Sequence, residues 1–85
     1  MSQENAQERI IVLLRRILED KDKHSDRWDA GVALHEGGLG LDSLDTATLS
    51  VLLEREFGRD PYTAGVFPGT LGELSAYMEE KRPIA

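Results

Sequence analysis

The sequence contains no cysteine, so it can form no disulfide bond, thiolate nucleophile or cysteine-ligated metal site. No apolar run approaches the roughly 20 residues that a membrane-spanning helix needs. Basic residues are in the minority, with 10 against 16 acidic residues and a net charge of −6. This balance argues against a nucleic-acid partner, because phosphates are held by clustered lysine and arginine. The first residues lack the basic-then-apolar order of a signal peptide. Together these absences predict a cytoplasmic protein without a membrane partner.

Metal-binding patterns are also missing. His24 and His35 are the only histidines, and two histidines without further ligands are typical of surface residues. A calcium loop starting at Asp20 would need glycine at its sixth position and glutamate at its twelfth. Ser25 and Gly31 stand there instead. The sequence therefore predicts no metal site.

The chain of 85 residues is long enough for one small domain, spanning 1–85, and too short for a second core. Its acidic charge is uneven. Residues 1–41 carry a net charge of −2 and residues 42–85 carry −4. The second half is therefore better suited to partners with basic surfaces. We expect a monomer.

Apolar residues at helical spacing predict three longer helices. The first covers about residues 4–20, with Ser2 or Asn5 as its N-cap and an apolar stripe of Ile10, Leu13, Leu14, Ile17 and Leu18. The second runs from about Ser43 to Phe57 and ends at Gly58. Its predicted core positions are Leu49, Leu53 and Phe57, with Ala47 and Leu52 beside them. The last starts near Thr70 in a Thr-x-x-Glu capping box and packs through Leu71, Leu74, Tyr77 and Met78 before Lys81, Arg82 and Pro83 end it.

Two connections join these helices. Residues 20–42 form a long loop whose first part is charged, and whose apolar residues are expected to fold back onto the helices: Trp28, Val32, Leu34, Leu39 and Leu41. Residues 59–69 are rich in turn formers, including Pro61 and Pro68. At most one short helical turn fits between these two prolines.

A glycine-rich loop meets the second helix at Gly38-Leu39-Gly40-Leu41-Asp42-Ser43-Leu44-Asp45. Gly37, Gly38 and Gly40 allow backbone angles that other residues resist. Either Asp42 or Ser43 can serve as N-cap. Ser43 should therefore lie at the positive end of a helix, where a phosphate is favoured. The alternative is that Ser43 serves only as a cap.

The segment Gly-Leu-Asp-Ser-Leu-Asp, followed by a helix that ends Leu-Glu-Arg-Glu-Phe-Gly, resembles the acyl carrier protein family, including peptidyl carrier domains. The resemblance covers nearly the whole chain. It implies an all-α four-helix bundle with a short third helix and a long first loop. It also implies that Ser43 carries a 4'-phosphopantetheine arm taken from coenzyme A, with Asp42 and Leu44 beside it as further cofactor-binding residues.

By this resemblance the protein is a carrier and not an enzyme, and no residue is catalytic. The arm would hold an acyl or aminoacyl group as a thioester. The implied partners are a phosphopantetheinyl transferase, a loading enzyme, and a synthase or transferase that takes the cargo. Partner docking would use the second helix through Asp45, Thr48, Val51, Glu54 and Arg55, with Asp42 and Glu56 nearby.

The sequence departs from fatty-acid carriers at Thr48 and Arg55, where those proteins usually have glutamates. This difference favours a specialised pathway, such as polyketide or nonribosomal peptide biosynthesis, over a generic fatty-acid synthase. Tyr77 and Met78 are expected in the core, with contact to the cargo as the alternative.

Two other functions compete with this interpretation. An unmodified carrier-like scaffold would not need a free hydroxyl at Ser43. A serine hydrolase would need a Gly-x-Ser-x-Gly elbow, a paired base and an oxyanion hole. Asp42 and Leu44 flank the serine instead, and the short chain leaves no room for a substrate cleft.

Overall fold

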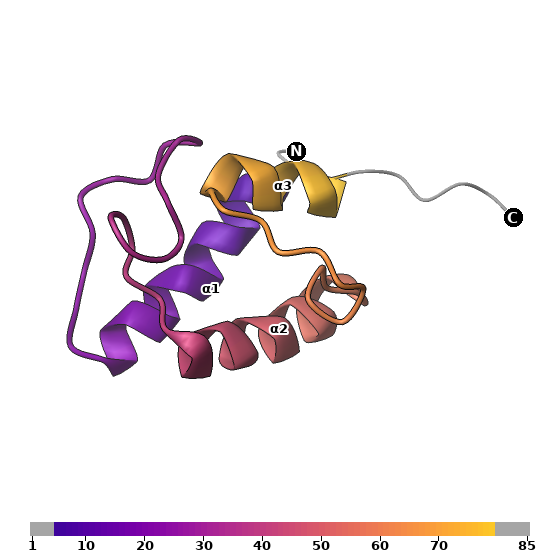
Figure 1. The fold of residues 1–85 in the computed structure, drawn as a ribbon, viewed down its shortest axis with the longest axis horizontal. Helices are drawn as coiled ribbons and strands as arrows, with labels where there is room; N and C mark the ends of the chain where they lie inside the picture. Colours follow the sequence, from indigo (N-terminus) through magenta and orange to yellow (C-terminus); the bar gives the residue numbers. More distant parts are fainter. Residues whose placement is uncertain (1–4, 80–85) are drawn as a thin grey trace, which may run out of the picture.

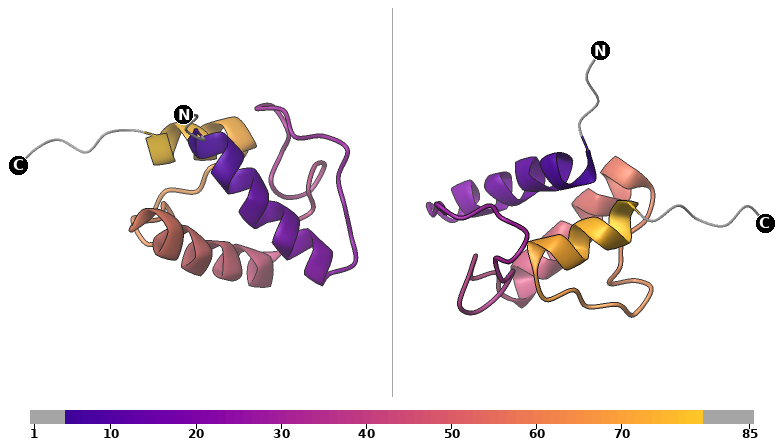
Figure 2. Two further views of the ribbon diagram at one scale, coloured as in Figure 1. Left: turned by 180° about the vertical axis from the view of Figure 1, so that it is seen from behind. Right: turned by 90° about the horizontal axis from the view of Figure 1, so that it is seen from above.

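Three helices make up the fold in the computed structural model, which describes residues 5–79 (Figure 1). They are α1 (Ala6–Asp20), α2 (Ser43–Phe57) and α3 (Leu71–Glu79). Helices α2 and α3 lie on the same side of α1 and pack against it, while they contact each other much less (Figure 2). Across residues 5–79 there is no sheet, and the one extended pairing is an isolated antiparallel bridge between Ala33 and Thr70. The chain is thus a small compact all-α domain with a long loop between its first two helices.

Helix α1 begins where the sequence predicts a cap. The Asn5 side chain accepts a hydrogen bond of 2.8 Å from the Glu8 N–H, which satisfies one donor of the first turn. The predicted stripe is buried along its full length, with Ala6 added at its start. Ser2, the other proposed cap, lies outside the described residues.

The core lies where the three helices meet the long loop. Helix α2 contributes Leu49 and Leu53, both with no exposed surface, and α3 contributes Leu71, Leu74 and Met78. The loop supplies four more buried residues, as expected: Val32, Leu34, Leu39 and Leu41. Trp28 and Tyr77 are half-buried at the edge of this cluster. Because a small domain has little core to spare, these loop residues are a necessary part of it.

Backbone hydrogen bonds fix the path of the loop. Its second half doubles back on itself through Leu39 N–H to the Ala33 carbonyl (2.8 Å) and Leu41 N–H to the Leu34 carbonyl (3.0 Å). It is then tied to the start of α3, where Leu71 N–H donates to the Val32 carbonyl at 2.9 Å. The second half of the loop is therefore held to itself and to the start of α3.

The three predicted loop glycines have two different roles. Gly37 and Gly40 have φ angles of +88° and +76°, which side chains of L-residues rarely adopt. Gly38 does not share this conformation. A Cβ atom there would lie 2.1 Å from the Ala33 carbonyl oxygen, so Gly38 is required by a close approach of two backbone segments.

Helix α3 starts with half of the predicted capping box. The Thr70 hydroxyl accepts from the Glu73 N–H at 3.1 Å. The Glu73 carboxylate reaches one residue further back than predicted and accepts from the Gly69 N–H at 2.7 Å. Lys81, Arg82 and Pro83, which were expected to end this helix, lie outside the described residues.

The structure confirms that no more than one helical turn fits between the two prolines: Ala64 N–H donates to the Pro61 carbonyl and Gly65 N–H to the Tyr62 carbonyl. The four-helix bundle implied by the resemblance is not found, because residues 5–79 form three helices and this turn stands where a short third helix was expected. Gly65, at a φ of +84°, prevents this turn from continuing as a helix. Ala47, predicted beside the core, is exposed because α2 buries only the narrow line through Leu49 and Leu53.

Candidate functional site

The start of α2 is organised by Asp42 and not by Ser43. The Asp42 carboxylate accepts from the Asp45 N–H at 2.8 Å, and the Asp45 carboxylate accepts from the Asp42 N–H at 3.0 Å. This reciprocal capping box satisfies two backbone donors at once. Ser43 is consequently the first residue of the helix, and its hydroxyl is not needed as a cap.

Ser43 is exposed, and its hydroxyl has no hydrogen-bond partner among residues 5–79. The N–H groups of Ser43 and Leu44 have no acceptor inside α2, because first-turn donors never do. They add to the positive end of the helix dipole. The Ser43 hydroxyl is therefore presented to solvent at the positive end of the helix dipole, and this dipole by itself favours negative charge there.

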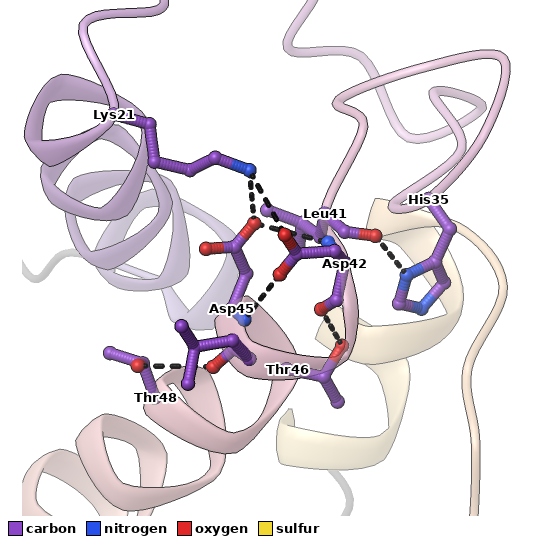
Figure 3. A network of polar contacts seen from close by, with 8 residues as sticks. Lys21, His35, Leu41, Asp42, Asp45, Thr46 and Thr48 are labelled. Carbon is purple, nitrogen blue, oxygen red and sulfur yellow. Dashed lines mark hydrogen bonds and ion pairs between the residues drawn. The ribbon is translucent and has the colours of Figure 1, made fainter.

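Lys21, directly after α1, joins the two capping carboxylates. Its Nζ lies 2.5 Å from Asp45 Oδ2 and 3.7 Å from Asp42 Oδ2, and Figure 3 shows it extending from the end of α1 toward the start of α2. Burial alone would raise the pKa of Asp45, but the hydrogen bonds from Lys21 and from the Asp42 N–H outweigh it and hold that pKa below its ordinary value. The Asp45 hydrogen bond in turn raises the pKa of Lys21.

His35 supports the same segment from the other side. Its Nδ1 lies 3.0 Å from the Leu41 carbonyl oxygen, which must accept, so Nδ1 carries the proton of this hydrogen bond (Figure 3). Leu41 is itself buried in the core. The residues before Ser43 are therefore fixed by a ring hydrogen bond and by an apolar anchor.

An open cleft of about 340 Å³ lies beside Ser43. Residues from three segments line it: His35, Leu41, Asp42, Ser43, Thr46, Tyr62 and Phe67. The Tyr62 and Phe67 rings contact each other with centroids 5.9 Å apart, and Phe67 is 74 % exposed. Nothing near these two aromatic residues in the sequence indicates that they belong to the site, because only the folded turn brings them to the start of α2.

The turn that carries Tyr62 is held by Asp60. The buried Asp60 carboxylate accepts from the Thr63 N–H and the Thr63 hydroxyl, each at 2.9 Å. Burial would raise the pKa of Asp60, but these bonds and one from Ser50 on α2 hold it below its usual value. The nearby Tyr62 hydroxyl is buried and has no hydrogen-bond partner among residues 5–79, and burial followed by the Asp60 charge raises its pKa.

The structure divides the docking residues predicted on α2. Thr48, Val51, Glu54 and Arg55 are all exposed. Asp45 is 7 % exposed and is already engaged with Lys21 and Asp42, so its side chain belongs to the local scaffold. Leu44, predicted as a cofactor-binding residue beside the serine, is 74 % exposed and adds a large apolar side chain to the outer surface of α2.

The part of the chain that the structure describes contains no candidate metal site. No group of three or more histidine and acidic side chains there could hold a metal ion. His24 is exposed, and His35 is used as described above. Among the same residues, no helix is long and apolar enough to span a membrane.

The residues around Ser43 fit a covalently attached phosphate-linked arm, since its side chain is exposed, has no hydrogen-bond partner among the described residues and lies beside a cleft with apolar and aromatic walls. Comparison of the chain with protein-family models, curated proteins and solved structures finds no match.

Proposed function

We propose that this protein is a carrier protein whose Ser43 hydroxyl is modified with 4'-phosphopantetheine. The observation that carries the proposal is that Asp42, and not Ser43, caps α2. The adjacent serine is exposed, and its hydroxyl has no hydrogen-bond partner among the described residues. A serine needed only for stability would be the cap itself, because that is the role in which serine stabilises a helix start.

The modification uses Ser43 as the nucleophile and coenzyme A as the donor, on a separate phosphopantetheinyl transferase. Ser43 Oγ forms a new bond to the phosphorus nearest the pantetheine. The bond from that phosphorus to the bridging oxygen breaks, and adenosine 3',5'-bisphosphate leaves. The serine proton passes to a base of the transferase. The chain contributes a hydroxyl that its own fold keeps accessible and a helix dipole that favours the resulting negative charge.

Once attached, the arm supplies a thiol that holds an acyl or aminoacyl group as a thioester. The cleft beside Ser43 offers Leu41, Tyr62 and Phe67 as apolar contacts for whatever Ser43 carries. The protein does no bond chemistry of its own in this function. It increases the effective concentration of a tethered cargo at the active sites of its partners.

In this proposal the fold corresponds to a four-helix carrier bundle in which the turn Pro61–Gly65 takes the place of the short third helix. The turn is supported by Asp60 and lies next to the cleft, as that element would. Partners would dock on the exposed side of α2, where Leu44 and Val51 are flanked by Thr48, Glu54 and Arg55. This surface mixes charges of both signs, which favours dedicated partners of a specialised biosynthetic pathway.

The test is the intact mass of the protein after incubation with coenzyme A and a broad-specificity phosphopantetheinyl transferase. We expect a gain of one phosphopantetheine in the natural chain and none in Ser43→Ala. Ser50→Ala, which changes another α2 serine, should be modified like the natural chain. If the folded natural chain gains no mass, an unmodified carrier-like scaffold becomes the better interpretation.

A further inference from the structure

Two carboxylates flank the hydroxyl that is to receive a phosphate. Asp42 precedes Ser43 directly, and Asp45 lies within the same helical turn and is bonded to the Asp42 backbone. Unlike Asp45, Asp42 keeps a side chain that is 62 % exposed. A phosphoryl donor that approaches Ser43 must therefore approach negative charge, which opposes the reaction unless a cation balances it.

Lys21 is the cation at this position. Within residues 5–79, it forms the only ion pairs of Asp42 and Asp45, at 3.7 Å and 2.5 Å. Its side chain is 25 % exposed, so solvent screens it less than the neighbouring lysine, Lys23, which is exposed and has no ion pair in the described residues. The cluster of one lysine and two aspartates carries a charge of −1, and without Lys21 it would carry −2.

We propose that Lys21 is a positioning residue for the modification of Ser43. It fixes the start of α2 against the end of α1 and offsets the Asp42 and Asp45 charges, so that the diphosphate of coenzyme A, held on its transferase, can reach the hydroxyl. This inference rests on the proposed function. It assigns to a residue far from Ser43 in the sequence a part in the rate at which the carrier is activated.

The first comparison is between Lys21→Met and Lys23→Met, which remove the same charge from neighbouring positions. We expect Lys21→Met to lower the rate of phosphopantetheine transfer about five- to tenfold, the effect of one unscreened charge near a protein surface. Lys23→Met should remain within about twofold of the natural chain, because Lys23 is exposed and forms no ion pair with Asp42 or Asp45 in the described residues. The rates are measured by intact mass at about 0.1 M ionic strength, where the screening length is about 10 Å.

A compensating variant separates charge from simple loss of structure. Lys21→Met combined with Asp45→Asn returns the cluster charge to −1 and keeps an amide oxygen that can accept from the Asp42 N–H. We expect this double variant to recover most of the lost rate, and Lys21→Arg to retain it. The deficit of Lys21→Met should also shrink at about 1 M salt, where the screening length is about 3 Å.

The possible outcomes are distinct. If the natural chain is modified and folded Lys21→Met is modified equally fast, the role of Lys21 is refuted while the carrier function stands. If the double variant stays as slow as Lys21→Met, the charge argument is refuted. If the natural chain itself is never modified, both proposals fail. Circular dichroism and urea unfolding of each variant show whether it is folded. If Lys21→Met alone is unfolded, the double variant decides the question: a folded double variant that is modified near the natural rate supports the charge argument, and a folded but slow one refutes it.

Discussion

Gly38 is the residue at which the loop before α2 approaches itself most closely. The position that a Cβ atom would occupy lies 2.1 Å from the Ala33 carbonyl oxygen and 2.8 Å from the Ala33 nitrogen. These are backbone atoms, which cannot rotate away as the end of a side chain can. Any side chain at Gly38 would therefore force the backbone segments around Ala33 and Gly38 apart.

We predict that Gly38→Ala lowers the free energy of unfolding by about 1–3 kcal/mol, the usual cost of forcing an extra methyl group into a packed region. Urea unfolding measures it. Gly69→Ala is the matched control, because its new Cβ would make only an ordinary 3.5 Å contact with the Glu73 carboxylate. The control should change stability by less than about 1 kcal/mol. Equal stability of the two variants would contradict the close approach.

At the residue scale, the sequence predicts which side chains occur at the site but not which of them caps the helix and which stays exposed. Asp42 and Ser43 are both good N-caps, so sequence preference alone leaves either as the cap. The structure selects Asp42, because its partner Asp45 is placed to complete a reciprocal pair. Lys21 could not be predicted as a member of this cluster, since nothing in its neighbourhood in the sequence points to residues of the next helix.

At the scale of elements, α2 has one narrow buried line and a wide exposed surface. Its C-terminal end is fastened to α1 by Arg9, whose guanidinium lies 2.9 Å from the Glu56 carboxylate and 4.3 Å from the centre of the Phe57 ring. The Glu56 carboxylate is therefore already paired with Arg9. Between the two ends of α2, the exposed side chains available to a partner are those of the proposed docking surface, in which Arg55 is the basic residue.

We predict that Thr48→Glu with Arg55→Glu makes the loaded carrier a better substrate for fatty-acid synthase partners, by about threefold or more, because complementary charge raises association rates. Steady-state turnover with such a partner measures it. Arg16→Glu is the control for Arg55→Glu, since it makes the same charge change at an exposed position on α1. Unchanged turnover in the double variant, or an equal gain in Arg16→Glu, would show that partners do not recognise α2 through its charges.

The helices themselves were predictable because local and long-range preferences agree. The bounds of α2 match the sequence prediction, from the residue after Asp42 to the residue before Gly58. For the segment after it, the two prolines predict at most one helical turn, as the structure shows, but not the contacts that fix this turn. The segment from Pro61 contains too few apolar residues to set a period, and the outcome depends on the Asp60 side chain and on the left-handed Gly65.

At the scale of the whole molecule, acidic residues outnumber basic ones, yet several of them stabilise the fold in their charged form. The pKa values of Asp45 and Asp60 both lie below their ordinary values. A carboxylate with a lowered pKa in the folded state contributes stability above its unfolded pKa of about 4, and this contribution disappears as the pH falls through the folded value. For Lys21, with a raised pKa, the contribution is complete below about 10.4 and is lost at higher pH.

We therefore predict that the free energy of unfolding is nearly constant around neutral pH and falls on the acid side from about pH 4. Asp45→Asn should flatten the acid-side fall, because it removes one of the groups that must take up a proton. Chemical denaturation at a series of pH values measures both curves. Parallel curves for the two proteins would mean that Asp45 has the same pKa in the folded and unfolded chains.

The bridge between Ala33 and Thr70 has a consequence for the order in which the molecule becomes structured during synthesis. The loop residues Val32 and Leu34 exchange backbone hydrogen bonds with Gly69 and Leu71, which a ribosome adds much later. A nascent chain that ends at α2 already contains Ser43 but lacks these partners. The segment before Ser43 therefore gains these hydrogen bonds only when the start of α3 has emerged, and under the proposed function the timing of translation would delay modification of Ser43 until the domain is whole.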